Sequence, residues 1–242
     1  DGVKTPDAKL CSKVRRFISL NLSKMSSYLG QNFQYELNLS PPFEMWFTDE
    51  GQDPDAPITP VRMNYARLCV ALVTVGGNAL KEILRTHFPV PYKDIYQVIL
   101  ANRDKFFKRR GRPLLSPEQR VLVFPGPSDD KVGTLDQFDL SILYTLIRNV
   151  STVPAPDTGW DLDPDDHPRD TSLGASVERI RSFRNNIIGH TVDGEIDQQN
   201  FEDYWNKFET VLHDIEAVIG GIVYSQELER QKRQVISIFE AC

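Results

Sequence analysis

The sequence predicts an all-α protein, a helical bundle with long loops. Two observations carry this prediction. Apolar residues recur at helical spacing in one stretch after another, and no stretch of any length alternates apolar and polar residues as a half-buried strand does. In addition, 242 residues of 40% hydrophobic composition are enough to build a real core. We therefore expect one main helical domain behind an N-terminal helical extension.

Composition narrows the class of protein. A net charge of -6 argues against a protein that coats nucleic acid nonspecifically, although a local basic patch is still allowed. The three cysteines, Cys11, Cys69 and Cys242, lie too far apart for a zinc site or a disulfide framework, so we expect a reducing, cytoplasmic compartment. The longest apolar run, residues 68–75, is far short of the ~20 residues that span a bilayer. No membrane association is expected.

Three segments are expected along the chain. Residues 1–59 form a helical extension and a Pro-rich linker, residues 60–222 the main domain, and residues 223–242 a C-terminal helix leading into a longer parent protein. Residue 1 is Asp rather than Met and the tail is charged and helix-like, so we expect the chain to be a piece of that parent. The extension has apolar residues at helical spacing: Leu10, Val14, Phe17, Ile18, Leu22, Met25 and Leu29.

The first half of the main domain begins with a long helix over residues 65–87, which Gly76 and Gly77 interrupt. Each glycine costs about 1 kcal/mol in a helix interior, so a close helix contact or a kink is expected there. A phosphate-binding glycine loop would need a preceding strand, and none is visible. The next helix, residues 92–110, ends in a basic run. That run is either a solvated helix end or a contact to nucleic-acid phosphates.

The second half has its own start and stop signals. Pro117 opens a short helix over residues 116–123, and Thr134 is expected to cap the helix that carries an apolar stripe through Asn149. Asp197 can cap the strong helix of residues 198–219, whose aromatic face indicates core packing. A charged terminal helix covers residues 227–239.

The connecting loop of residues 154–170 is the most acidic part of the chain. Its aspartates at 161, 163 and 165 mimic the first three ligand positions of a calcium-binding hand. Asp166, however, stands where the turn glycine belongs, and Ser172 where the bidentate glutamate belongs. We therefore expect neither a metal ion nor a cofactor.

The stretch of residues 177–190 carries the main functional signal. A helix here places its apolar side chains on one arc, and Arg184 falls in the middle of that arc. A guanidinium facing a core costs several kcal/mol unless it is paired, hydrogen-bonded or open to a ligand. The nearest polar residues in sequence are Asn185, Asn186 and His190.

These residues can form either a functional site or a purely structural arrangement. Arg184 and His190 lie about 120° apart around a regular helix and ~9 Å apart along it, so they do not share a face. Gly189 can end the helix and turn His190 back, or a two-fold partner can bring a second copy of the pair alongside. In a purely structural arrangement, Asn186 and His190 hydrogen-bond at i and i+4. Arg184 then pairs with an acidic residue of helix 198–219.

Arg184-Asn185 followed by His190 resembles the signature of HEPN domains (higher eukaryotes and prokaryotes nucleotide-binding). The chain is most similar to the animal branch found in ubiquitin ligases of the DAZ-interacting zinc-finger type, roughly over residues 60–220. The blocks that carry this resemblance stand in order: Asn64-Tyr65-Ala66-Arg67-Leu68 with Gly76-Gly77, Phe138-Asp139-Leu140 through Leu146-Ile147-Arg148-Asn149, Gly159-Trp160, Arg184-Asn185 with Gly189-His190, and Tyr204-Trp205.

The resemblance implies a bundle that dimerises across two motif helices and, in active members, a metal-independent endoribonuclease. His190 would be the general acid or base, Arg184 the stabiliser of phosphate charge, and Asn185 the polar residue that orients one of them. Single-stranded RNA or a nucleotide would be the ligand. Because other members act only in binding, a non-catalytic, dimerising adaptor of a larger regulatory or innate-defence protein is the alternative.

Overall fold

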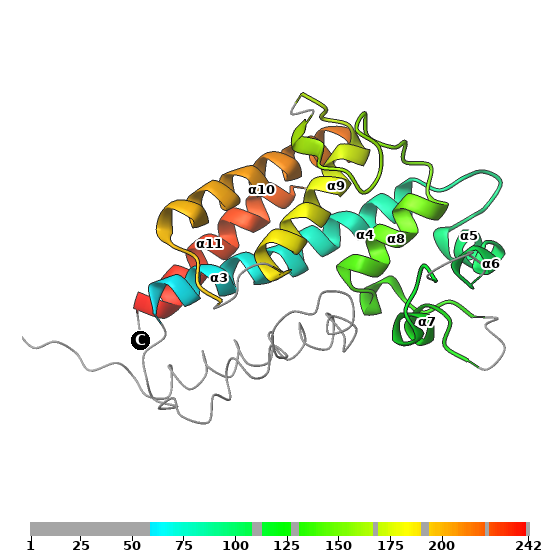
Figure 1. Cartoon of the computed structure of the whole chain (residues 1–242), viewed down its shortest axis with the longest axis horizontal. Helices are drawn as coiled ribbons and strands as arrows, with labels where there is room; N and C mark the ends of the chain where they lie inside the picture. Colours follow the sequence, from blue (N-terminus) through cyan, green and yellow to red (C-terminus); the bar gives the residue numbers. More distant parts are fainter. Residues whose placement is uncertain are drawn as a thin grey trace, which may run out of the picture.

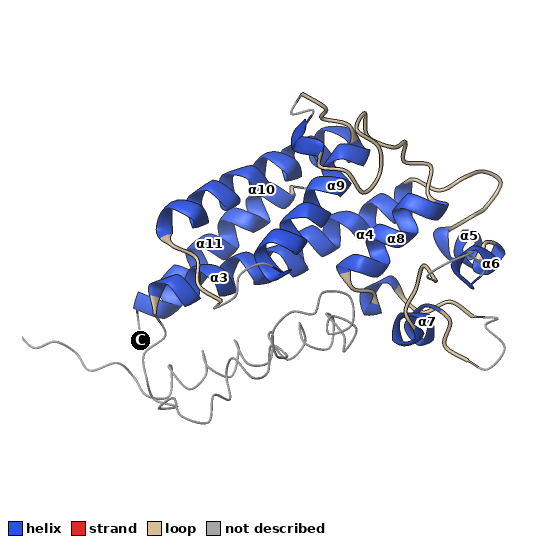
Figure 2. Ribbon diagram, viewed as in Figure 1, coloured by secondary structure: helices blue, strands red, loops and turns tan. Residues whose placement is uncertain are grey.

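In the structure, a computed structural model, residues 59–107, 113–126, 131–166, 169–189, 194–220 and 223–240 are described, without the side chains of 166, 188–189 and 233–240. Within these residues all regular structure is helical, which confirms the all-α class (Figure 2). None of the helices described is both long and apolar enough to cross a membrane. The expected N-terminal helix and nearly all of the Pro-rich linker lie outside the described residues.

A long, nearly continuous helix runs through the bundle (Figure 1). It consists of α3 (Pro60–Ala71), the π-helical segment η2 (Leu72–Gly76) and α4 (Gly77–Thr86). Around it pack α8 (Leu140–Val150), α9 (Leu173–Phe183), α10 (Gln198–Ile219) and α11 (Tyr224–Glu240). Helix α10 contacts α3, α4, α9 and α11, while α8 contacts α4 and α9. The largest fully buried side chains include Trp205, Phe106, Phe124, Phe138 and Phe201.

Gly76, the first glycine of the pair, marks a close helix contact, which is one of the two features that the sequence predicted there. A Cβ atom built on Gly76 would lie 3.3 Å from Cζ of Phe208 on α10. The ring of Phe208 in turn meets Phe183 of α9 edge-on, with centroids 5.8 Å apart. The bare backbone of Gly76 thus lets α10 approach the long helix closely, and α9 is held against the same aromatic contact.

Three short helices, α5 (Ile95–Ala101), α6 (Arg103–Phe107) and α7 (Pro117–Val123), lie at one end of the molecule (Figure 1). The prediction of a single helix over residues 92–110 is wrong, because the helix is interrupted at Asn102. The Asn102 side-chain amide donates to the Val98 carbonyl at 2.8 Å, a local bond that competes with helix continuation. Residues 108–112 of the basic run lie outside the described residues.

The helix caps agree with the sequence at α7 and α10 but not at α8. Asp197 accepts from the Asn200 amide at 2.8 Å, as expected for the cap of α10. Thr134 precedes only the short 3-10 turn η3 (Leu135–Gln137), so its assignment as the cap of α8 is wrong. The cap of α8 is Asp139, whose carboxylate accepts from the Ile142 amide at 2.7 Å. Both threonine and aspartate are good N-caps, and the apolar pattern alone does not show which of them directly precedes the first helical residue.

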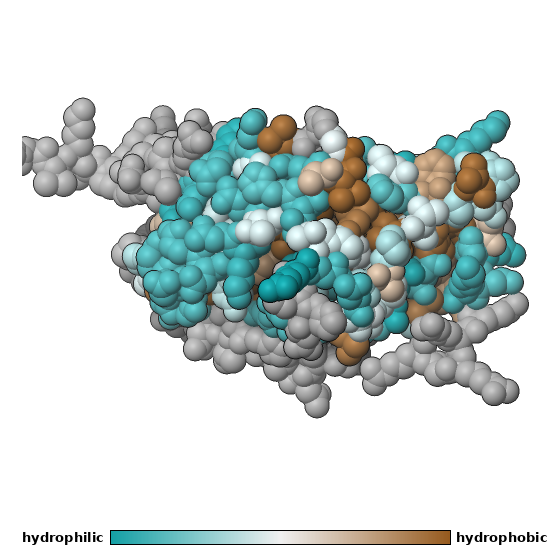
Figure 3. Space-filling model, turned by 90° about the horizontal axis from the view of Figure 1, so that it is seen from above, coloured by the Kyte–Doolittle hydropathy of each residue, from teal (hydrophilic) through white to brown (hydrophobic). Residues whose placement is uncertain are grey.

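The surface is mostly hydrophilic, with apolar areas on the face that Figure 3 shows. Large apolar side chains that are exposed within the described residues include Val90, Val121, Leu162, Val218 and Val223. They belong to different helices and loops, as scattered surface apolar residues usually do. The site is therefore sought among the polar residues of α9, not on an apolar surface patch.

Candidate functional site on helix α9

Arg184 lies where α9 passes into its π-helical end, η5 (Arg184–Gly189). The apolar arc predicted around it is confirmed, since Val177, Ile180 and Ile187 are buried. The guanidinium itself is partly buried, and its Nη1 donates to Oδ1 of Asn185 at 2.9 Å. A π-helical turn is rare and is found often at functional sites. It also means that regular helical angles do not apply beyond Arg184.

Asp139, at the start of α8, supplies an acidic neighbour for Arg184. Burial raises the pKa of Asp139, while hydrogen bonds from the Ile142 and Ser141 amides and the charge of Arg184 oppose that rise. Gln119 of α7 also hydrogen-bonds the same carboxylate. Three separate elements therefore meet at this end of α9. The acidic residue that the sequence suggested for Arg184 was sought on helix 198–219, and Asp139 was not considered.

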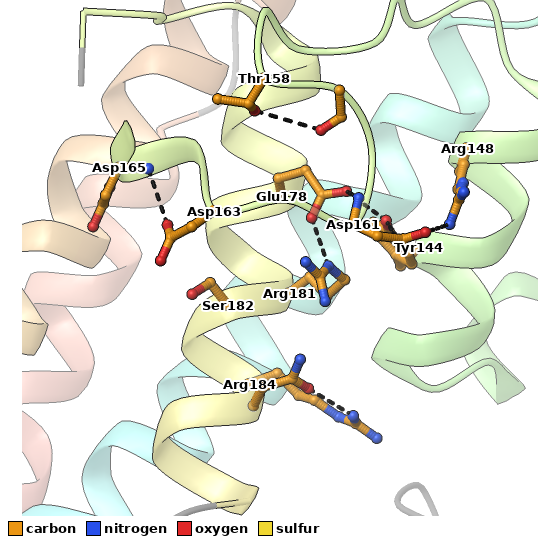
Figure 4. A network of polar contacts seen from close by, with 12 residues as sticks. Tyr144, Arg148, Thr158, Asp161, Asp163, Asp165, Glu178, Arg181, Ser182 and Arg184 are labelled. Atoms are coloured by element: carbon orange, nitrogen blue, oxygen red, sulfur yellow. Dashed lines mark hydrogen bonds and ion pairs between the residues drawn. The ribbon is translucent and has the colours of Figure 1, made fainter. Parts of the chain in front are cut away.

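A second polar cluster lies in the preceding half of α9, around Glu178 (Figure 4). Glu178 is fully buried. Its carboxylate accepts from the Tyr144 hydroxyl at 2.5 Å, the Asp161 amide at 2.8 Å and Nε of Arg181 at 2.5 Å. Arg148 pairs with the Asp161 carboxylate. Two carboxylates and two guanidinium groups thus balance each other in one network, which is the condition for burying such charges.

The acidic loop reaches this network because α9 has no side chain at Gly174. A Cβ atom there would lie 2.3 Å from the Pro154 carbonyl oxygen and 3.0 Å from the Pro156 nitrogen. The loop can therefore lie directly on the first turn of α9. Farther along, Trp160 packs edge-on against Tyr144, with ring centroids 6.0 Å apart. Asp161 takes a left-handed backbone conformation with φ of 69°.

The network shifts the pKa values of Tyr144 and Arg181 away from neutral pH. Burial and the hydrogen bond to Glu178 raise the pKa of Tyr144, so this hydroxyl remains a neutral donor. Burial alone would lower the pKa of Arg181, but its hydrogen bond to Glu178 and the charge of that residue raise it instead. Tyr144 and Arg181 therefore serve binding or positioning, not proton transfer near neutral pH.

The structure brings two of the three predicted site residues together. Arg184 and Asn185 are hydrogen-bonded to each other, whereas His190 lies outside the described residues, and its role stays a prediction. The Asn186 amide donates to Ser182 Oγ at 3.3 Å. Sequence reasoning missed Glu178, because the loop just before α9 folds back over the face that carries it, and local periodicity does not show such a turn. In the part of the chain described, no group of three His, Cys, Asp or Glu side chains is placed to hold a metal ion.

Comparison with known proteins gives a family and two relatives. The sequence model of the family described as "DZIP3/hRUL138-like HEPN" matches residues 92–237, more than half of the chain. E3 ubiquitin-protein ligase DZIP3 of Mus musculus is 28% identical over 86 residues, which are 36% of this chain and 7% of the relative. The protein of the same name from Homo sapiens is 27% identical over 86 residues, with the same coverage of both chains. The chain thus matches only a small part of these relatives. No solved structure matches it significantly.

Proposed function

This chain belongs to the DZIP3/hRUL138-like HEPN family, as its motif blocks predicted, and we propose that it is an RNA-associated domain whose phosphate site lies at the π-helical end of α9. The observation that carries the proposal is the placement of Arg184. This partly buried cation is held by Oδ1 of Asn185, 2.9 Å from its Nη1, beside the carboxylate of Asp139. A guanidinium oriented in this way presents an ordered positive charge, the kind of group that binds phosphate oxygens.

The finer proposal is metal-independent cleavage of single-stranded RNA in a homodimer. The 2′-hydroxyl attacks the adjacent phosphorus and loses its proton, and the 5′-oxygen of the next nucleotide leaves and takes up a proton. His190 transfers these protons, Arg184 stabilises the charge on the phosphoryl oxygens, and Asn185 orients Arg184. Two motif helices related by a two-fold axis would bring both copies of Arg184 and His190 to one substrate. A nucleotide would bind through the same phosphate contact.

Cleavage of a labelled pool of single-stranded RNA in excess chelator tests the nuclease directly. We expect the wild type to cleave and the folded variants Arg184→Ala and His190→Ala each to lose about 100-fold or more in rate. Arg230→Ala is the matched control, because Arg230 is an exposed arginine of α11, far in sequence from the motif, and its loss should leave the rate unchanged. A folded His190→Ala variant that cleaves at the wild-type rate would overturn the nuclease proposal.

A second candidate is a dimerising adaptor without catalysis, and the electrostatic attraction between Arg184 and Asp139 favours it. In this function Arg184 is a brace that joins the end of α9 to the start of α8. The wild type would then cleave no RNA, and Arg184→Ala would lower the stability of the fold or dissociate the dimer. A strictly monomeric mass in light scattering would count against this adaptor.

The domain is further proposed to work within a longer cytoplasmic protein of regulation or innate defence. The matched stretch makes up 7% of each relative, and both relatives are named E3 ubiquitin-protein ligases. Cys69 is a buried free thiol, in keeping with a reducing compartment. Fractionation of cells that express the parent protein, probed with an antibody to this domain, tests the location. A membrane or secreted fraction alone would contradict it.

A further inference from the structure

We propose that Arg181 is a second phosphate-binding residue, which extends the site of Arg184 along α9 toward the next phosphate of the same strand. This inference rests on the proposed RNA function of Arg184. The sequence motif does not include Arg181. Three observations on the described residues support this role: Arg181 lies beside Arg184, it binds Glu178 through Nε only, and Glu178 is buried.

The two arginines lie next to each other on one side of α9. Residues three apart in a helix are neighbours on its surface, about 4.5 Å apart along the axis. Figure 4 shows the side chains of Arg181 and Arg184 extending from successive turns of α9 toward the side of α8. Successive phosphates of one strand are likewise neighbouring negative charges along its backbone. One strand running along α9 can therefore meet both cations.

Arg181 is anchored in a way that leaves its terminal groups available. It binds Glu178 through Nε, and its guanidinium lies over the ring of Tyr144, 5.5 Å from the centroid. Among the described residues, no acceptor takes a hydrogen bond from its Nη atoms, and 24% of the side chain is exposed. Arg148 differs, because its terminal Nη1 already binds Asp161. Two parallel Nη donors suit phosphate oxygens.

Glu178 orients Arg181 without occupying its outward face. The carboxylate is wholly inside the protein and also receives hydrogen bonds from the Tyr144 hydroxyl and the Asp161 amide. A surface ion pair would have to be broken before the arginine could bind a ligand. Here the pair can persist while the Nη atoms contact a phosphate. The side chain is already ordered, so less rotamer entropy is lost on binding.

The test is the salt dependence of binding to a short fluorescent single-stranded oligonucleotide with 2′-O-methyl riboses, which cannot be cleaved through the 2′-oxygen. Anisotropy titrations in chelator at several KCl concentrations give the slope of log K against log salt. Each lost phosphate contact reduces the magnitude of this slope by about 0.7. We expect that reduction for Arg181→Gln, but not for Arg181→Lys, which keeps the charge. Arg230→Gln, which removes another arginine paired with a glutamate three residues earlier, should keep the wild-type slope.

Removal of Arg181 leaves Glu178 buried without its cation, so Arg181→Gln can fail to fold. The comparison of Glu178→Gln with the double variant Glu178→Gln/Arg181→Gln avoids this problem, because these two differ only at residue 181. A smaller slope in the double variant supports the inference. An unchanged slope there, together with a reduced slope in Arg184→Gln, overturns the role of Arg181 and leaves the proposed function intact. A wild type that binds no oligonucleotide overturns both.

Discussion

The charged residues around Glu178, in the first half of α9, and Arg184, at its π-helical end, have different surroundings. Around Glu178 every charged group is matched inside the protein by side chains and backbone from α8, α9 and the acidic loop. At the other end, Arg184 donates a hydrogen bond to its neighbour Asn185 and its charge acts on Asp139, and the helix there is π-helical. The first half holds the fold together, while the second keeps a cation in an irregular turn at the end of a helix. The surroundings of a charge on α9 thus differ between a matched network and a partly buried cation.

The difference follows from what covers each half. The loop of residues 154–161 lies on the first half, and the backbone amide of Asp161 donates to Glu178. At the second half, η5 packs against α3, and the connection onward includes residues that are not described. We therefore expect substitution of Glu178 to act on stability. Under the proposed function, substitution of Arg184, or of Arg181 beside it, acts chiefly on RNA binding.

The largest effect is expected from Glu178→Ala. The substitution leaves Arg181 without its buried counter-ion and removes the acceptor of Tyr144 and of the Asp161 amide. Loss of one member of a buried ion pair costs about 3–5 kcal/mol. Urea unfolding followed by circular dichroism should show that loss as a lower midpoint at constant slope.

Glu229→Ala on α11 is the matched control, because Glu229 is a partly exposed helical glutamate and its loss should change stability by about 0.5 kcal/mol or less. If Glu178→Ala is as stable as this control, the first half of α9 is not a structural network. The contrast between the two halves would then fail.

Gly174→Ala sharpens the comparison at the loop contact. The added methyl group would lie 2.3 Å from the Pro154 carbonyl oxygen, so the loop must move off α9. Such overpacking costs about 1–3 kcal/mol. Gly77→Ala is the control, since its new methyl group would meet only Leu140 Cδ2 at 3.9 Å. Alanine is the better helix former by about 1 kcal/mol, so that variant should be more stable than the wild type. Equal unfolding midpoints for both variants would show that the loop does not rest on Gly174.

Much of the bundle could be predicted from the sequence, because local signals agree with the final packing. The cap Asp197 and the aromatic face of α10, together with the close approach at Gly76, follow from spacing and residue type alone. The break at Asn102 could not be predicted in this way. It depends on one side-chain bond to the Val98 carbonyl inside an otherwise helical pattern.

The candidate site was predictable only where its residues are neighbours in sequence. Arg184 and Asn185 stand out because a charge falls on an apolar arc. Glu178 was not singled out, since its burial depends on how the loop before α9 folds back onto the helix. Asp139 stands in one of the motif blocks but was not considered as a neighbour of Arg184, because its place beside that residue depends on how α8 packs on α9. Long-range packing of this kind leaves no mark in local periodicity.

The smallest expected effect is a pH dependence at the Arg184 end. Burial raises the pKa of Asp139 above its ordinary value of 3.8, so the native state holds this proton more tightly than the unfolded state does. The stability that the protonated form contributes is therefore complete below 3.8 and is lost as the pH rises through the raised value. Asp139→Asn keeps a good cap and removes the titration.

Unfolding midpoints from below pH 3.8 to neutrality should show the wild type losing stability relative to this variant, by less than the Gly174→Ala effect. The exposed cap Asp197, whose pKa is lowered by the Asn200 hydrogen bond, should give the opposite sign in Asp197→Asn. If both variants change the pH dependence of stability in the same direction, Asp139 is not buried beside Arg184. The proposed link between α8 and the end of α9 would then be wrong.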